Sequence, residues 1–305
     1  MNAGLFDPRK GHEAVTAERM AFGREPYEPA RSNYFTVYWI ASGAGTVWAD
    51  TAAHSFGPKT LLFAGPYQRI RFAATRPVRG EAIRFHANFL CVETFHAETG
   101  CSGALFNDPF GSPLVALDRQ AKVEVPALVD RIHREQTERA VGYAEALLAY
   151  LKILLIVATR LKGERAGTRG KAGDPRDHVL ERVKDLVEQN YRALHAPSDY
   201  ATLLHVTPKA LTHFVRTSLG KTMTDLIRER ILVHAKWDLL HTLKPVKEIA
   251  GELGFGDELY FSRFFKKSTG QSPSHFREFE TAIRNGSNLS MSFVHPPIPR
   301  VPVRG

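Results

Sequence analysis

Charged and polar side chains gather on one face of a short helical pattern near the C-terminus of the chain. The residues opposite its apolar stripe are Glu258, Ser262, Arg263, Lys266 and Lys267. An arginine can bind the O6 and N7 atoms of guanine with two hydrogen bonds, a glutamate can accept from the N4 amine of cytosine, and lysines suit phosphate oxygens. The chemistry predicted for this face is therefore recognition of DNA, and no catalytic residue is predicted.

Two short helical patterns with a tight turn between them must position this face. The apolar residues of the first pattern have the spacing of one helix face: Val246, Ile249, Ala250 and Leu253. Gly254 follows as a turn residue, and Asp257 is placed to cap the second helix. The buried stripe of that helix is Phe261, Phe264 and Phe265. The arrangement is typical of a helix-turn-helix, whose second helix enters a major groove.

A similar pattern lies upstream. Ser198 or Asp199 is expected to cap a short helix, a turn follows at His205, and Thr207 caps the next helix. One continuous helix, Thr224–Leu240, joins the two units and has a length of about 26 Å. Because adjacent major-groove entries on one face of B-DNA lie about 34 Å apart, this connector is expected to place two recognition helices in successive grooves.

The second unit resembles the signature of the AraC/XylS family of bacterial transcription regulators. The residues that carry the resemblance are Ile249-Ala250, Gly254-Phe255, Tyr260-Phe261-Ser262-Arg263, Phe265-Lys266-Lys267, Gly270, Ser272-Pro273 and Phe276-Arg277. The similarity extends upstream to about Pro175. It implies a DNA-binding domain over residues 175–282, with helix-turn-helix units at 198–219 and 245–268.

The resemblance also implies which side chains meet DNA. The family's base-contacting positions fall on six residues of this chain, which are Lys209, Thr212, His213, Glu258, Leu259 and Arg263. Lys266 and Lys267 are better suited to phosphates. The first unit departs from the family pattern, because His205 replaces the usual turn glycine and Val215 replaces a phenylalanine. It is therefore expected to bind DNA more weakly or with a different specificity.

Between Tyr34 and His86 the pattern changes to short apolar and β-branched runs. Turn signals such as Ser42-Gly43-Ala44-Gly45 and Arg76-Pro77 separate them. Many short strands predict a jelly roll or small barrel, which is similar to the cupin-like effector domain of many AraC-type regulators. The predicted fold class is α+β multidomain, with an N-terminal cupin-like β-barrel or jelly roll with helices and a C-terminal all-α double helix-turn-helix.

An aromatic-lined pocket for a small-molecule effector is one interpretation of the N-terminal domain. The candidate lining residues are Trp39, Trp48, Phe63, Tyr67, Phe85 and His86. The alternative is that these side chains fill the core. Metal-binding cupins carry paired histidines, whereas His54, His86 and His96 are scattered, so neither a metal nor another cofactor is expected.

Two helical patterns follow the strands, Val123–Glu138 and Tyr143–Leu161, and the second is apolar over more than one face. A homodimer through residues 123–161 is expected, and the alternative is a helix buried twice within one monomer. The remaining segments are predicted as an arm over 1–20, an effector and dimerisation domain over 21–162, a flexible basic linker over 163–174 and a disordered tail over 283–305. The arm is either a frayed terminus or a cover for the effector pocket.

The composition limits the class of protein. A length of 305 residues suits two domains, and a net charge of +9 favours a polyanionic partner such as double-stranded DNA. The two cysteines, Cys91 and Cys101, lie outside any Cys/His cluster, so neither a disulfide framework nor a zinc site is expected. No signal peptide and no apolar span of membrane length is recognised, which predicts a cytoplasmic protein without membrane contact.

We interpret the chain as an effector-responsive, DNA-binding transcription regulator and not as an enzyme. RNA polymerase is an expected partner if the protein is an activator. Two alternatives are left open, which are a cupin metalloenzyme fused to a DNA-binding domain and a ligand-free dimerising DNA-binding protein. An ordered metal with open coordination positions would favour the enzyme.

Overall fold

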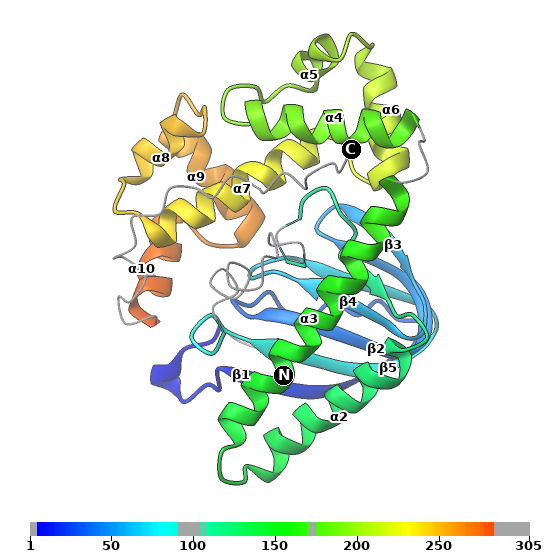
Figure 1. Cartoon of the computed structure of the whole chain (residues 1–305). Helices are drawn as coiled ribbons and strands as arrows, with labels where there is room; N and C mark the ends of the chain where they lie inside the picture. Colours follow the sequence, from blue (N-terminus) through cyan, green and yellow to red (C-terminus); the bar gives the residue numbers. More distant parts are fainter. Residues whose placement is uncertain (1–4, 91–104, 107, 171–174, 284–305) are drawn as a thin grey trace, which may run out of the picture.

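The computed structural model describes residues 5–90, 105–106, 108–170 and 175–283. The N-terminal part is an antiparallel sheet covered by two long helices, and the C-terminal part is helical (Figure 1). The predicted α+β organisation in two parts is therefore confirmed. Cys91, Cys101, His96 and the segment 284–305 lie outside the described residues.

The sheet has six strands in the order β1-β5-β2-β4-β6, and β3 pairs with β2. Every pairing is antiparallel. The strands are β1 (Val15–Phe22), β2 (Phe35–Ala49), β3 (Ala52–Phe56), β4 (Thr60–Ala64), β5 (Ile70–Phe85) and β6 (Leu114–Ala116).

Two segments predicted as turns are instead the middle of long strands. The register between β2 and β5 shifts between Ile40 and Gly45, which marks bulges. A side chain at Gly43 would come within 2.5 Å of the Pro77 carbonyl oxygen, and one at Gly45 within 2.3 Å of the Ala73 oxygen. These glycines therefore permit close passage of β5 instead of ending the strand.

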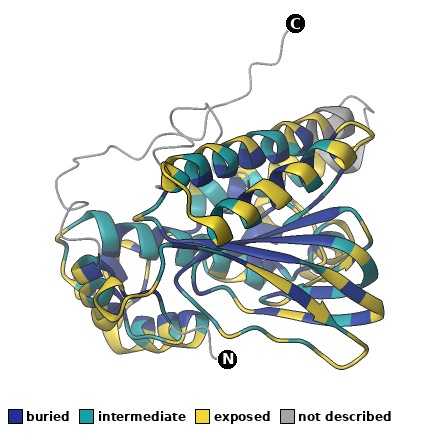
Figure 2. Ribbon diagram, turned by 90° about the horizontal axis from the view of Figure 1, so that it is seen from below, coloured by how far each residue is buried: buried dark blue, intermediate teal, exposed yellow. Residues whose placement is uncertain are grey.

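Both faces of the sheet are buried. Along β2, Val37 and Trp39 belong to the cluster that packs under the helices, whereas Tyr38 and Ile40 pack on the other face. On that other face, Phe72 makes edge-to-face contacts with Tyr38 and Phe56, with ring centroids 5.4 and 5.8 Å apart. The strands accordingly appear mostly buried in Figure 2.

The covering helices are α2 (Ala121–Glu138) and α3 (Tyr143–Gly170). Helix α3 continues through most of the segment predicted as a flexible linker, 163–174. The reason is that glutamate, arginine and alanine in this segment favour helix, and each glycine opposes it by only about 1 kcal/mol. Residues 171–174 lie outside the described part.

The predicted N-terminal arm also has regular structure. A short 3-10 helix, η1 (Pro8–Lys10), precedes β1, and β1 pairs with β5 from Val15↔Phe85 to Phe22↔Val78. Phe6 is buried between Tyr34 and His86. Within the described residues this segment is therefore part of the sheet domain and not a frayed terminus.

The C-terminal part has one apolar core, formed mainly by its helices with Tyr67 and Phe110 of the sheet domain. Helix α7 packs against both of its halves. The helices are α4 (Pro175–Asn190), α5 (Pro197–Leu203), α6 (Pro208–Leu219), α7 (Met223–His241), α8 (Val246–Glu252), α9 (Glu258–Thr269) and α10 (Pro273–Ile283).

Candidate functional site

The second helix-turn-helix is formed by α8 and α9. The side chain of Asp257 accepts hydrogen bonds from the backbone nitrogens of Leu259 and Tyr260, at 3.1 and 3.0 Å, and so caps α9 as predicted. Phe261 and Phe265 are fully buried. The opposite face carries exposed side chains, which include every residue predicted to contact DNA in this unit: Glu258, Leu259, Arg263, Lys266 and Lys267.

The first helix-turn-helix is formed by α5 and α6. The hydroxyl of Thr207 accepts from the backbone nitrogen of Ala210 at 3.2 Å, which confirms the predicted cap of α6. Lys209 and His213 are exposed, and Thr212 is half-buried beside them. The predicted cap of α5 is wrong: the N-cap is Ala196, because Pro197 occupies the first turn where its missing N–H is not needed.

The turns of the two units have the same backbone geometry. Gly254 has φ 79°, and His205 occupies the equivalent position with φ 54°. The residue after each donates to a carbonyl five positions back, from Phe255 to Ala250 at 2.9 Å and from Val206 to Ala201 at 3.0 Å. The predicted non-glycine residue in a left-handed turn is therefore confirmed.

Helix α7 joins the two units, within one residue of the predicted bounds. It begins with a reciprocal cap between Thr222 and Asp225. At 19 residues it is about 28 Å long. Figure 1 shows α6 and α9 near opposite ends of α7. The length of α7 is thus of the same order as the roughly 34 Å between successive major-groove entries.

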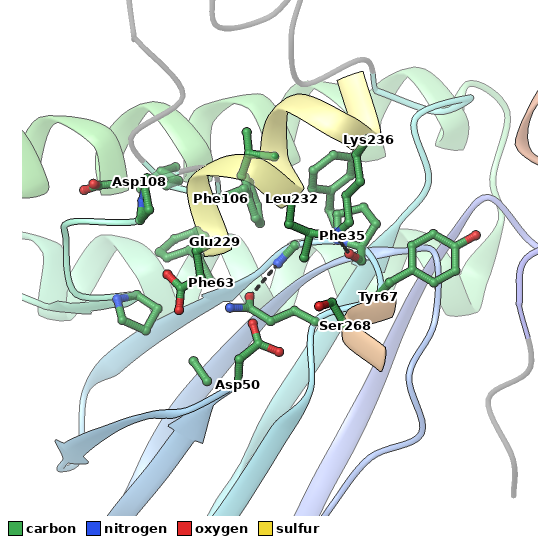
Figure 3. Close-up of a pocket in the computed structure, with 18 of the residues that line it drawn as sticks. Phe35, Asp50, Phe63, Tyr67, Phe106, Asp108, Glu229, Leu232, Lys236 and Ser268 are labelled. Carbon is green, nitrogen blue, oxygen red and sulfur yellow. Dashed lines mark hydrogen bonds between the residues drawn. The ribbon is translucent and has the colours of Figure 1, made fainter. Parts of the chain in front are cut away.

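A pocket of about 210 Å³ lies where the sheet domain meets α7, α9 and α10. Phe35, Phe63 and Phe106 form part of its apolar wall, and Leu232 approaches from α7. Glu229 and Lys236 also project from α7 toward the strands (Figure 3). The arrangement can hold a small molecule with an apolar body and a polar group.

Burial perturbs the ionisable groups of this pocket. It lowers the pKa of Lys236 to about 8 and that of His54 to about 4, with nearby lysines adding to the effect on His54. Burial raises the pKa of Glu229 to about 7, although Lys221 pairs with it at 2.6 Å. Lys236 donates to the Pro66 carbonyl oxygen at 2.8 Å, and the Asp50 and Glu280 carboxylates oppose the lowering of its pKa.

The six residues predicted to line an effector pocket do not surround one cavity. Phe63 and Tyr67 line the pocket described above. Trp39 and Phe85 lie in the core under α2 and α3, Trp48 is partly exposed beneath the Arg71 guanidinium, and His86 lies 3.4 Å from the Glu280 carboxylate. Trp39, Phe63 and Phe85 share the sheet face under α2 and α3, whereas Tyr67 and His86 lie outside the strands, so the six side chains do not converge on one cavity.

Sequence reasoning missed the contribution of α7, α9 and α10 to the pocket. Glu229, Lys236 and Ser268 are separated from the strand residues by more than 150 positions, so no local pattern brings them together. The sequence offered no signal for this lysine, because the burial of Lys236 shows only in the tertiary structure. Within the described ranges, no group of three or more His, Cys, Asp or Glu side chains is placed to hold a metal.

Comparison with known proteins identifies the C-terminal part. A family model described as a helix-turn-helix domain matches residues 200–278. The arabinose operon regulatory protein of Salmonella typhimurium is 40% identical over 72 residues, which cover 24% of this chain and 26% of that protein. The transcriptional activator RhaR of Cronobacter sakazakii is 23% identical over 55% of this chain and 58% of its own length. The match thus spans less than two thirds of either relative.

Among solved structures, ToxT of Vibrio cholerae aligns over 88% of this chain and 99% of its own, with 14% identity and a TM-score of 0.36. No helix in the described ranges is both long enough and apolar enough to cross a bilayer. The family match and its position define the class of domain as a DNA-binding helix-turn-helix. Residues 200–278 form an AraC-type helix-turn-helix domain, as the motif residues predicted.

Proposed function

We propose that this protein is a sequence-specific, DNA-binding regulator of transcription that reads DNA with α6 and α9. The observation that carries the proposal is the exposed polar face of α9. Helix α9 is capped at its start and buries its opposite face, so its polar side chains point outward at one end of α7. In α9, base contacts are assigned to Glu258, Leu259 and Arg263. In α6, base contacts are assigned to Lys209, Thr212 and His213. Lys266 and Lys267 are assigned to phosphates.

Selection of bound sequences from random DNA tests this proposal and defines the site. On the selected sequence, Arg263→Ala is expected to lower affinity by about 1–3 kcal/mol and to relax one base position, because a bidentate base contact is lost. Lys266→Ala is the matched control, which should weaken specific and scrambled DNA alike and reduce the salt slope by about one. Equal losses on both DNAs for Arg263→Ala would place that side chain on phosphate.

We also propose that a small-molecule effector binds in the pocket between the sheet domain and α7. On the sheet face opposite α2 and α3, the side chains pack against one another. The junction with α7 is therefore a better effector site than the space beside that face. Lys236 offers a positive charge at the pocket, and the adjacent rings offer an apolar surface. The chemistry that fits is a small organic acid with an apolar body.

A panel of small aromatic and aliphatic carboxylates, each beside its neutral amide, tests the effector proposal. At least one acid is expected to raise the melting temperature, whereas its amide should not. Lys236→Met should abolish the shift, while Lys122→Met at an exposed position of α2 should preserve it. Acid binding should weaken as pH rises through about 8, where Lys236 loses its proton. Equal shifts by an acid and its amide would exclude the charge contact.

Four finer features belong to the same proposal. The N-terminal domain is cupin-like, a homodimer forms through residues 123–161, RNA polymerase is contacted if the protein activates transcription, and the protein acts in the cytoplasm. The proposed N-terminal domain includes β1 and therefore begins before the predicted bound of 21, and the bounds 175–282 of the DNA-binding domain belong to the same proposal. The relatives are named as regulators, which supports the proposal that this protein is not an enzyme.

A further inference from the structure

A buried carboxylate lies between the two parts of the molecule. Glu280 of α10 is 2% exposed. Its Oε1 atom accepts hydrogen bonds from the Tyr67 hydroxyl and from the Asn33 amide nitrogen, the latter at 3.1 Å. His86 Nε2 lies 3.4 Å from Oε2. These three groups belong to the sheet domain, so the buried carboxylate of α10, a helix of the C-terminal part, is hydrogen-bonded by the other domain.

Neighbouring contacts attach the same half of the DNA-binding part. The Asn88 amide donates to the Ile283 carbonyl oxygen at 2.7 Å, at the end of α10. The Arg31 guanidinium donates to the Ser268 carbonyl oxygen at 3.1 Å, near the end of α9. A cation at a helix C-terminus also complements the helix dipole. The sheet domain therefore holds both helices by directional hydrogen bonds.

Aromatic packing transmits the position of α10 to α9. Phe276 of α10 packs against Phe265 of α9, with ring centroids 5.4 Å apart, and against Tyr67 at 5.1 Å. Arg277 donates to the Leu239 carbonyl oxygen of α7 at 3.0 Å. Displacement of α10 would therefore displace the recognition helix packed on it.

The first half of the DNA-binding part touches the sheet domain at a separate place. Lys221, at the start of α7, donates to the Pro109 carbonyl oxygen at 2.9 Å. The sheet domain is thus attached near both ends of α7. Because α7 packs with both halves, the separation of α6 and α9 depends on the bending of α7 and on these two attachments.

We propose that Glu280 is a positioning residue for DNA recognition, which fixes α9 relative to α6 by tying the second helix-turn-helix to the N-terminal domain. The inference rests on the proposed reading of DNA by α6 and α9. It adds a route by which the N-terminal domain sets the spacing that the protein recognises. The junction pocket lies beside the hydrogen bonds of Glu280, because Tyr67, Ser268 and Glu280 line the pocket.

The test uses the full chain and the site obtained by selection. One base pair is inserted or deleted between the parts of the site assigned to α6 and α9, and affinity is measured by fluorescence anisotropy. The wild-type protein is expected to lose affinity by about tenfold on each altered spacing. Glu280→Gln and Tyr67→Phe should reduce that penalty to about threefold or less. Tyr34→Phe is the matched control, because its hydroxyl donates to Glu13 within the sheet domain.

Each outcome separates the explanations. A wild-type protein that binds no DNA would overturn the proposed function itself. A steep spacing penalty that persists in both Glu280→Gln and Tyr67→Phe would overturn the positioning role. Variants that lose affinity equally on all spacings would assign Glu280 to stability alone and would also overturn it. If Glu280→Gln fails to fold by circular dichroism, the milder Tyr67→Phe, which keeps its ring packing, decides the question.

Discussion

Gly254 and His205 occupy equivalent turns but tolerate different side chains. Both have positive φ, which favours glycine and disfavours most other residues. A side chain at Gly254 would meet the Arg192 carbonyl oxygen at 2.0 Å, so the position also lacks space. His205 is exposed, so its side chain has space, and the positive φ is the only constraint on this position. The two units therefore differ in how strictly the turn specifies its residue.

We expect Gly254→Ala to destabilise the protein by about 2–4 kcal/mol, because backbone strain and a steric clash add together. His205→Gly should change the free energy of unfolding by less than about 1 kcal/mol, since relief of strain is offset by a more flexible unfolded chain. Urea denaturation of both variants measures the difference. Similar effects at the two sites would contradict this account of the turns.

Glu229 links stability to pH. Burial raises its folded pKa to about 7, above the ordinary value of 4.5. Between these values the folded protein holds a proton that the unfolded chain has released, so this group's contribution to stability is present below pH 4.5 and is lost as pH rises through 7.

Removing the carboxyl with Glu229→Gln should remove that contribution. The free energy of unfolding of the wild type, taken relative to the variant, should fall by on the order of 2 kcal/mol between pH 4.5 and 7. Denaturation curves at several pH values provide the measurement. Glu188→Gln, which removes an ion pair with Arg230 outside the pocket, serves as the control. A constant difference across the pH range would show that Glu229 does not titrate there.

At the scale of elements, the packing of α3 determines how much apolar surface this helix leaves exposed to a partner. Leu147, Leu151 and Leu154 are almost fully buried on the sheet side. Ile156 and Val157 also pack partly against that core, so the fold uses more of the helix than the sequence suggested. Ile153 remains 41% exposed and faces away. The outward apolar surface is therefore narrower than the pattern of the whole helix.

If α3 forms the dimer contact, Ile153→Asp should shift the full chain from dimer to monomer at micromolar concentration, because a charge would be buried in the interface. Arg24→Asp places the same carboxylate at an exposed position outside residues 123–161 and should leave the dimer intact. Sedimentation velocity distinguishes the two species. A monomeric wild-type protein, or loss of the dimer in both variants, would count against this interface.

At the scale of the whole molecule, two recognition helices in one chain predict an asymmetric site. One subunit should cover two successive major grooves, and a dimer should prefer directly repeated sites to a short palindrome. Binding to matched direct and inverted repeats of the selected sequence, at equal length, measures this preference. Equal or tighter binding to the inverted repeat would require a different arrangement of the subunits on DNA.

The sequence alone determined the helix-turn-helix units, because their signals are local. Capping residues, a positive-φ turn and helical spacing of phenylalanines all lie within about 30 residues, and the structure places α6, α7 and α9 where they predict. The outward orientation of Glu258, Arg263 and Lys266 follows from the same spacing, since residues opposite a buried stripe must face outward.

Only the tertiary structure decided the course of the long strands, the extent of α3 and the junction between the domains. Ser42–Gly45 has the composition of a turn, yet pairing with β5 carries the strand through it. The aromatic residues of the strands could not be assigned to one pocket, because Trp39 and Phe85 pack in the core under α2 and α3 while Phe63 also reaches the junction pocket. Glu280, Tyr67 and Asn33 meet across more than 200 positions of sequence, and that contact follows from the docking of two domains and not from any local pattern.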